Sequence, residues 1–339
     1  MVHLPSWGLW KMTPAPGLDR VSTILQLFVT GFDGYVLPPE VAGMLARGLA
    51  GVTLFSRNIR DRAQVRDLCG SIRAAARPCG LVPVIAVDQE GGRVQRLKSI
   101  SDRLPAMREV ADPWAAGEVT GRELADLGFN LDFAPVLDVD TNPDNPIIGD
   151  RSFSSEPNEA ASRAIQFFHG LARHGIAGCG KHFPGHGDAS ADSHLELPVI
   201  DVERETFFRR ELHPFASAVG AGFKMFMTAH CLYPAFDKQY PATLSPSFIR
   251  PLLRGALGFD GVVISDDLGM KAISDRFSNE DIIVQGVAAG LDLFLSCGTD
   301  GQSSRLIEAM CRLVRSGRLD QEAISGSVER VAAFRRCLS

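Results

Sequence analysis

The chain has 339 residues, of which 45% are hydrophobic and 22% are charged, a composition typical of folded globular proteins and unlike that of disordered, collagen-like or coiled-coil chains. The 35 Lys and Arg residues against 40 Asp and Glu residues give a net charge of −5, and without a dense basic segment neither nucleic acid nor an anionic membrane is an expected partner. The seven cysteines form no C-x-x-C pair, and the first residues lack a secretory signal pattern, so we expect a soluble cytoplasmic protein.

The predicted elements begin after a short lead-in. Prolines and glycine without any period predict an extended segment over residues 1–20, followed by one domain over residues 21–339. In that domain short apolar runs alternate with longer amphipathic stretches, a pattern typical of repeated βα units around a parallel sheet. We expect strands in eight of these runs, at residues 24–30, 52–55, 82–87, 131–136, 176–181, 224–229, 261–265 and 291–296.

Two of the expected helices have clear end signals. Asp61 precedes an apolar face and is a plausible N-cap, and a second stripe over residues 306–314 ends near Gly317, which suits a C-cap. Eight strands with about as many helices predict a single-domain α/β fold, a (β/α)₈ TIM barrel. A doubly wound sheet with a smaller second domain is the alternative.

Polar residues follow most of the expected strands. The sequence has Asp88 to Arg93 after the third strand, Asp138 after the fourth, Lys181 and His182 at the fifth, His230 after the sixth, and Asp266 and Asp267 after the seventh. A single charged residue at a strand end is usually a solvated edge. In a barrel, however, the carboxyl ends of all strands surround one mouth. We therefore expect these side chains to converge on a functional site.

The segment 181–194 holds three of the eight histidines. His182 and His186 have the spacing of a helical zinc pair, but Pro184 and Gly185 between them disfavour a helix, so no metal is predicted. Asp192 stands two residues before His194, a spacing that lets a carboxylate orient an imidazole for proton transfer. Ser193 lies outside any G-x-S-x-G motif and is not expected to be a nucleophile.

The pair Asp266 and Asp267 follows a strand that is expected to be buried. A carboxylate at this place could attack an anomeric carbon or bind a cation. Asp267 is expected instead to cap the next helix. The sequence has neither a dinucleotide fingerprint nor a P-loop, and the loop 297–301 is interpreted as a plain turn, so no cofactor is expected.

Together, the segments 88–94, 181–194 and 264–268 resemble glycoside hydrolase family 3, and more narrowly its single-domain bacterial β-N-acetylglucosaminidases of peptidoglycan recycling. The resemblance runs from about residue 24 to the C-terminus. It implies a catalytic set in which Asp266 is the nucleophile and His194, held by Asp192, is the general acid/base. It also implies a set of substrate-binding residues for the terminal sugar: Asp88, Arg96, Arg151, Lys181 and His182. For Glu90, Arg93, His186 and Asp188 a role in shaping the loops and a direct sugar contact both stay open.

The implied activity is that of a retaining exo-β-N-acetylglucosaminidase. Its substrate would be a small carbohydrate, the terminal N-acetylglucosamine of a muropeptide fragment, and a monomer without cofactor or metal is expected. Gly185 and Gly187 further suggest a loop that swings over the bound sugar to bring in His194. Four different functions stay open: a β-glucosidase or β-xylosidase, an N-acetylglucosaminide phosphorylase, a metal-dependent hydrolase, and a sugar-binding barrel without activity.

Overall fold

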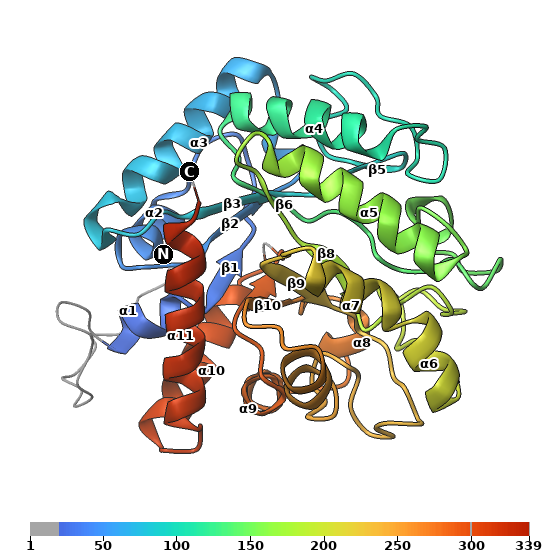
Figure 1. The fold of residues 1–339 in the computed structure, drawn as a ribbon. Helices are drawn as coiled ribbons and strands as arrows, with labels where there is room; N and C mark the ends of the chain where they lie inside the picture. The colour runs from blue at the N-terminus through green and yellow to red at the C-terminus, as the bar shows by residue number, and fades with distance from the viewer. Residues whose placement is uncertain (1–19, 299, 339) are drawn as a thin grey trace.

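Helices surround parallel strands in the computed structural model, which describes residues 20–298 and 300–338 (Figure 1). The predicted lead-in therefore lies outside the described residues, except for Arg20, at which the first helix begins. The α-helices are α1 Arg20–Leu25, α2 Pro39–Ala46, α3 Arg62–Ala76, α4 Pro113–Leu127, α5 Pro157–Ala172, α6 Arg204–Arg210, α7 His213–Gly220, α8 Lys271–Ser274, α9 Asn279–Ala289, α10 Gln302–Arg315 and α11 Gln321–Arg336. Short 3₁₀ segments and a π-helical segment, Ile249–Ala256, lie between them.

The strands form two parallel sheets and a small antiparallel hairpin. They are β1 Phe28–Thr30, β2 Gly51–Leu54, β3 Val84–Val87, β4 Gln89–Gly91, β5 Val94–Gln95, β6 Leu131–Asp132, β7 Ala177–Gly178, β8 Gly180–Phe183, β9 Met225–Thr228, β10 Val262–Ser265 and β11 Phe294–Ser296. One sheet has the order β11-β1-β2-β3-β6-β7, the other the order β10-β9-β8, and β4 pairs with β5.

The expected parallel α/β architecture is thus confirmed, whereas a closed eight-stranded barrel stays a prediction. The strands are divided between two sheets instead of forming one continuous ring. Isolated parallel bridges connect the edges of the two sheets, one between Val136 and Lys181 and one between Ile264 and Leu293. All strand ends that were expected to carry polar residues therefore point the same way.

The predicted and observed strands differ most clearly at three places. The fourth strand was expected over residues 131–136, but β6 ends at Asp132, and Val136 makes only an isolated bridge. Residues 24–30 were expected to form one strand, but α1 continues to Leu25 and the Leu27 N–H donates to the Ile24 carbonyl, so the strand begins only at Phe28. Residues 176–181 form two strands, because β7 pairs with β6 and β8 pairs with β9. The β4–β5 hairpin was not expected. Its turn uses Gly91 and Gly92 at φ values of 110° and 55°, which glycine adopts readily.

The two helix ends that the sequence predicts are present. The Asp61 carboxylate accepts a hydrogen bond from the Gln64 N–H and caps α3. Helix α10 ends at Arg315, and Gly317 follows at a φ of 69°, the conformation that favours glycine after a helix.

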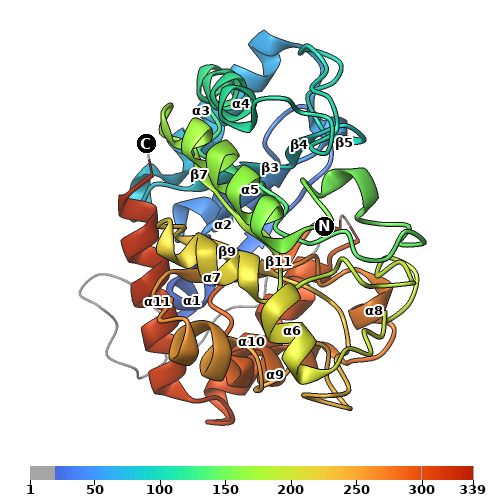
Figure 2. The ribbon, with the colours of Figure 1, turned by 45° about the vertical axis from the view of Figure 1, so that its right-hand side comes forward.

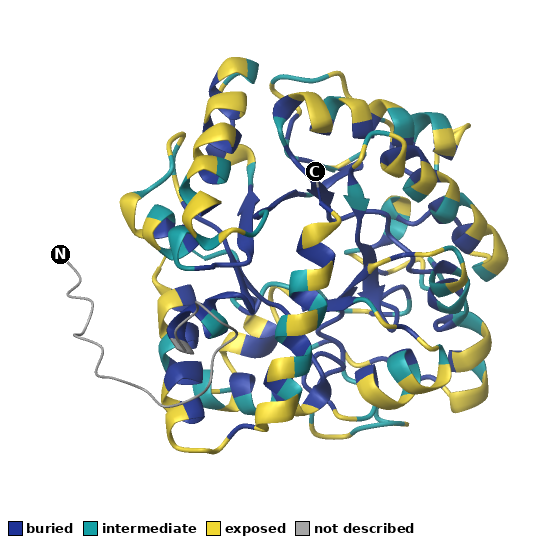
Figure 3. Cartoon of the chain, turned by 60° about the vertical axis from the view of Figure 1, so that its left-hand side comes forward, coloured by how far each residue is buried: buried dark blue, intermediate teal, exposed yellow. Residues whose placement is uncertain are grey.

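The strands and the helix faces turned toward them are buried (Figure 3), and the apolar core lies on both sides of the strands. A large cluster fills the space between the strands and the outer helices, and α4 and α5 lie side by side over part of it (Figure 2). A second cluster lies among the strands and includes Val331 and Phe334 from α11 and Leu338, two residues after that helix ends. Within the part of the chain that the structure describes, no helix is long and apolar enough to cross a membrane.

Candidate active site

A cavity of about 450 Å³ opens at the carboxyl ends of the strands. Side chains from several strands and from the loops that follow them line it. Among them are all the predicted site residues except Asp192: Asp88, Arg96, Arg151, Lys181, His182, His194 and Asp266. Residues far apart in the sequence therefore meet at one place, as the polar strand ends predict.

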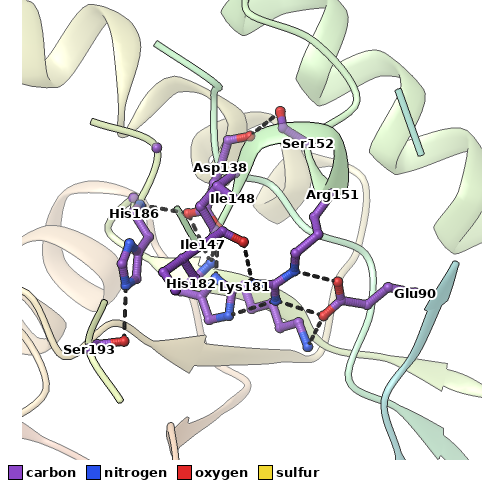
Figure 4. Close-up of polar contacts among 12 residues, drawn as sticks. Glu90, Asp138, Ile147, Ile148, Arg151, Ser152, Lys181, His182, His186 and Ser193 are labelled. Atoms are coloured by element: carbon purple, nitrogen blue, oxygen red, sulfur yellow. Dashed lines mark hydrogen bonds and ion pairs between the residues drawn. The ribbon is translucent and has the colours of Figure 1, made fainter. Parts of the chain in front are cut away.

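Five charged side chains form a compact network on one wall of the cavity, and Figure 4 shows three of them, Lys181, Glu90 and Arg151. The Lys181 Nζ lies 2.8 Å from an oxygen of Asp88 and 2.6 Å from an oxygen of Glu90. Arg151 binds both oxygens of Glu90, each at 2.8 Å. Arg96 reaches Asp88 more loosely, at 3.4 Å.

Each member of this network supports the charge of its neighbours. Burial alone would lower the pKa of Lys181, but Asp88 and Glu90 raise it above its usual value. Burial alone would raise the pKa of Glu90, but Arg151 and Lys181 hold it well below its usual range. The wall is therefore ionised at neutral pH and offers both donors and acceptors to a hydroxylated ligand.

Asp138 is the centre of a second network that the sequence did not assign. Its oxygens accept hydrogen bonds from the backbone N–H of His182, from the His182 ring at 2.6 Å, and from the backbone N–H of His186 at 2.7 Å. Burial would raise the pKa of Asp138, but His182 lowers it. The carboxylate fixes the His182 ring, whose other nitrogen lies 3.5 Å from Arg151. The peptide bond between Lys181 and His182 is cis.

The two carboxylates after β10 have different environments. Burial would raise the pKa of Asp266, but His182 and His230 together with the Asp267 N–H, which donates to it at 2.7 Å, keep the pKa below its usual value. Asp266 is thus an ionised carboxylate that lines the cavity.

Asp267 does not cap a helix, so that expectation was wrong. Helix α8 begins at Lys271, and its N-cap residue, Met270, makes no side-chain cap. The Asp267 carboxylate instead accepts from the N–H groups of Gly269 at 3.0 Å and Cys297 at 2.9 Å. It therefore joins the loop after β10 to the end of β11.

The loop 184–194 brings a histidine–aspartate pair to the rim of the cavity. The His194 Nδ1 lies 2.9 Å from Asp192 Oδ1, and the same oxygen accepts from the His194 backbone N–H at 2.8 Å. The His194 side chain is 64% exposed and that of Asp192 is 27% exposed. An Asp that binds one ring nitrogen leaves the other free to exchange a proton with a ligand.

The remaining open residues support loops. Arg93 donates to the carbonyls of Ile147 and Ile148, and Asp188 forms an ion pair with Arg210 at 2.6 Å. His186 lines the cavity and contacts Ser193. Among the described residues no group of three or more His, Cys, Asp or Glu side chains could hold a metal ion.

Comparisons with known proteins agree with this geometry. Residues 33–334 match the family model described as the glycosyl hydrolase family 3 N-terminal domain. The chain is 42% identical over 294 residues to a β-hexosaminidase of Pseudomonas aeruginosa, a match that covers 84% of each chain.

Solved structures are similar as well. A family 3 β-N-acetylglucosaminidase of Paenibacillus sp. has a TM-score of 0.91 at 36% identity, and the match covers 95% of this chain but only 63% of that longer one. A β-N-acetylhexosaminidase of Beutenbergia cavernae has a TM-score of 0.87 at 28% identity, with 95% of this chain and 100% of that one covered. The chain therefore belongs to glycosyl hydrolase family 3, and its relatives group it with the glycoside hydrolases of the β-N-acetylhexosaminidase type.

Proposed function

We propose that the protein is a retaining exo-β-N-acetylglucosaminidase that releases terminal, non-reducing N-acetylglucosamine from peptidoglycan fragments. The observation that carries this proposal is the combination of one half-buried, ionised carboxylate, Asp266, and one exposed imidazole, His194, on the same cavity, with Asp192 bound to a nitrogen of that imidazole. A nucleophile and a separate proton carrier are what double displacement at an anomeric carbon requires.

In the proposed reaction Asp266 attacks the anomeric carbon while protonated His194 gives its proton to the leaving oxygen. A covalent bond forms between the sugar and the Asp266 oxygen as the glycosidic bond breaks. His194, now neutral, takes a proton from water, which displaces Asp266 and restores both groups. Two displacements leave the configuration unchanged.

The charged wall supports binding of one sugar unit. The volume of the cavity is in the range of small-molecule sites. Asp88 and Lys181 can accept and donate hydrogen bonds to hydroxyls, and the Arg96 Nε is buried without a hydrogen-bond partner among the described residues, as expected of a donor that a ligand completes. Apolar side chains such as Phe133, Met227 and Leu295 also line the cavity. Polar and apolar side chains together suit a sugar ring, which has hydroxyls at its edge and C–H groups on its faces.

Release of nitrophenol from 4-nitrophenyl N-acetyl-β-glucosaminide, compared with the plain β-glucoside and β-xyloside, tests the proposal. We expect activity on the acetamido sugar, none with the Asp266→Ala variant, and the β-anomer of the sugar as first product by NMR. Turnover by Asp266→Ala near the wild-type level would refute the role of Asp266. Preference for the glucoside or xyloside would move the assignment to those glycosidases.

The same assay distinguishes a hydrolase from three further functions. Formation of a sugar phosphate in phosphate buffer would indicate a phosphorylase, since a neutral histidine repels phosphate less than a carboxylate does. Loss of activity with a chelator would indicate a metal-dependent hydrolase. Binding of N-acetylglucosamine without turnover of any glycoside would indicate a sugar-binding protein.

The proposal also covers the fold, the oligomeric state and the cellular location of the protein. We propose one catalytic domain with a closed (β/α)₈ barrel over residues 21–339, a monomer in the cytoplasm. The cysteines support a reducing compartment, because all seven are free thiols. Light scattering of the purified protein and fractionation of cells test the monomer and the location.

A further inference from the structure

We propose that Ser193 and His186 are positioning residues for proton transfer, because their contact holds the Asp192–His194 pair at the rim of the cavity. The inference rests on the proposed function, since it requires His194 to be the acid/base. It concerns two residues to which neither the sequence motifs nor the charged wall assign a role.

Ser193 lies between the two members of the pair in the chain and is anchored from two sides. Its Oγ lies 3.2 Å from the His186 Nε2, and its carbonyl accepts a hydrogen bond from the Ala272 N–H of α8 at 3.3 Å. Ser193 is only 2% exposed, whereas the His194 side chain is 64% exposed. The exposed imidazole therefore stands directly beside a buried, fixed residue.

His186 is itself held rigidly. Its backbone N–H donates to Asp138 at 2.7 Å, and its carbonyl accepts from the Asn145 side chain at 2.8 Å. Burial and the nearby His182 lower the pKa of His186 to about 4. The ring is thus neutral at physiological pH and keeps its hydrogen bond to Ser193, while its Nδ1 has no hydrogen-bond partner among the described residues.

These contacts connect the charged wall of the cavity with Ser193 on the loop 184–194 (Figure 4). The carboxylate of Asp138 orients His182 against the charged wall and also holds the backbone of His186, whose ring contacts Ser193. The connection then runs through Ser193 to its neighbours Asp192 and His194. A misplacement of about 1 Å in a reacting group can cost a factor of ~10² in rate. Loosening Ser193 should therefore impair proton transfer without removing either of the two groups proposed to react, Asp266 and His194.

The test compares a substrate that needs protonation of its leaving group with one that hardly needs it. We expect the Ser193→Ala variant to lose ~10- to 100-fold in kcat/KM on methyl N-acetyl-β-glucosaminide, and less than ~3-fold on the 4-nitrophenyl glycoside. The matched control is Ser190→Ala, the same change at an exposed position of the same loop. This control should retain wild-type values on both substrates.

A merely structural role would give a different pattern. If Ser193→Ala lowers kcat/KM on both glycosides by the same factor, or changes neither, the inference is overturned. Thermal unfolding shows that the variant is folded, and the pre-steady-state rate at which N-acetyl-β-glucosaminyl fluoride glycosylates Asp266 shows that the nucleophile is intact, because fluoride leaves with little protonation. Both should match the wild type.

A double-mutant cycle tests whether His186 acts through Ser193. If it does, the His186→Ala, Ser193→Ala double variant loses about as much on the methyl glycoside as the less active of the two single variants, whereas independent effects multiply. The His194→Ala variant distinguishes the positioning role of Ser193 from the acid/base role of His194, on which it rests. If the loss in kcat/KM is larger on the methyl glycoside for His194→Ala but not for Ser193→Ala, only this inference is refuted. If His194→Ala loses the same factor on both glycosides, the proposed acid/base role of His194 is refuted.

Discussion

Glu90 and Arg151 face each other through two hydrogen bonds, Arg151 Nε to one carboxylate oxygen and Nη2 to the other, each 2.8 Å long. Glu90 is 1% exposed and also binds Lys181 at 2.6 Å. Glu90→Gln leaves both cations without this negative charge. Breaking a buried ion pair by removing one partner costs about 3 kcal/mol or more, so we expect a loss of that size in the free energy of unfolding, together with a raised KM.

Urea unfolding and steady-state kinetics measure the two effects. Glu123→Gln is the matched control, because Glu123 pairs with Arg62 at 2.7 Å in a more exposed position, where such a pair contributes at most about 1 kcal/mol. Equal losses in the two variants would contradict the central role of Glu90.

The site residues could be predicted from the sequence further than their supports could. Asp266, His194 and Lys181 stand directly at strand ends or in an unusual loop, so the chain order alone indicated that they meet. Asp138 also followed an expected strand, but its carboxylate binds the His182 ring and two backbone N–H groups. Contacts of this kind depend on how the chain returns after β8 and leave no pattern in the sequence.

The fold was predictable where local signals act alone. Asp61 could be assigned as a cap because a cap involves only the next few residues. The pairing of β7 and β8 with different strands depends on neighbours far along the chain. Likewise Asp267 was expected to cap a helix, but the N–H of Cys297 on a distant loop is its partner. The swinging of the loop 184–194 stays a prediction.

His194→Ala should show how the proposed proton transfer is divided between the two steps. We expect kcat/KM on a glycoside with a poor leaving group to fall by ~10²- to 10⁴-fold, because the general acid is lost. On the 4-nitrophenyl glycoside kcat/KM should fall much less, while kcat falls because His194 is also the base that activates water. Pre-steady-state release of nitrophenol should then show a burst. Equal losses in kcat/KM on both substrates would count against this assignment.

Asp132 should make the folded protein less stable as the pH rises. Burial raises the pKa of its carboxyl to about 8, against 3.8 for the ordinary group, so between these values the folded state holds a proton that the unfolded state releases. The stability from this group is present below pH 4 and is lost as the pH rises to 8, at up to about 1.4 kcal/mol per pH unit.

The Asp132→Asn variant isolates this effect, since groups common to both proteins cancel. The Asn side chain can still accept the hydrogen bond that the Gln89 N–H donates to Asp132 at 3.0 Å. Between pH 5.0 and 7.5 we expect the variant to gain about 3 kcal/mol over the wild type in urea unfolding. A difference that is the same at both pH values would show that Asp132 is ionised in the folded protein.

Gly187→Ala should disturb the loop that carries the proposed acid/base, His194. A Cβ at Gly187 would lie 1.6 Å from the Val139 carbonyl oxygen, so either the loop or the segment after Asp138 must move. Forcing a group into a filled space costs about 1–3 kcal/mol, and the shift displaces His194. We therefore expect lower stability and a loss of activity that is larger on the methyl glycoside than on the 4-nitrophenyl glycoside.

Gly70→Ala is the control, because Gly70 lies in α3 with nothing within 4 Å of the added methyl. This substitution should stabilise the helix by about 0.5–1 kcal/mol. Wild-type stability and activity in Gly187→Ala would contradict this prediction. They would mean that this part of the loop moves away from Val139 without a cost in free energy, as a swinging loop requires.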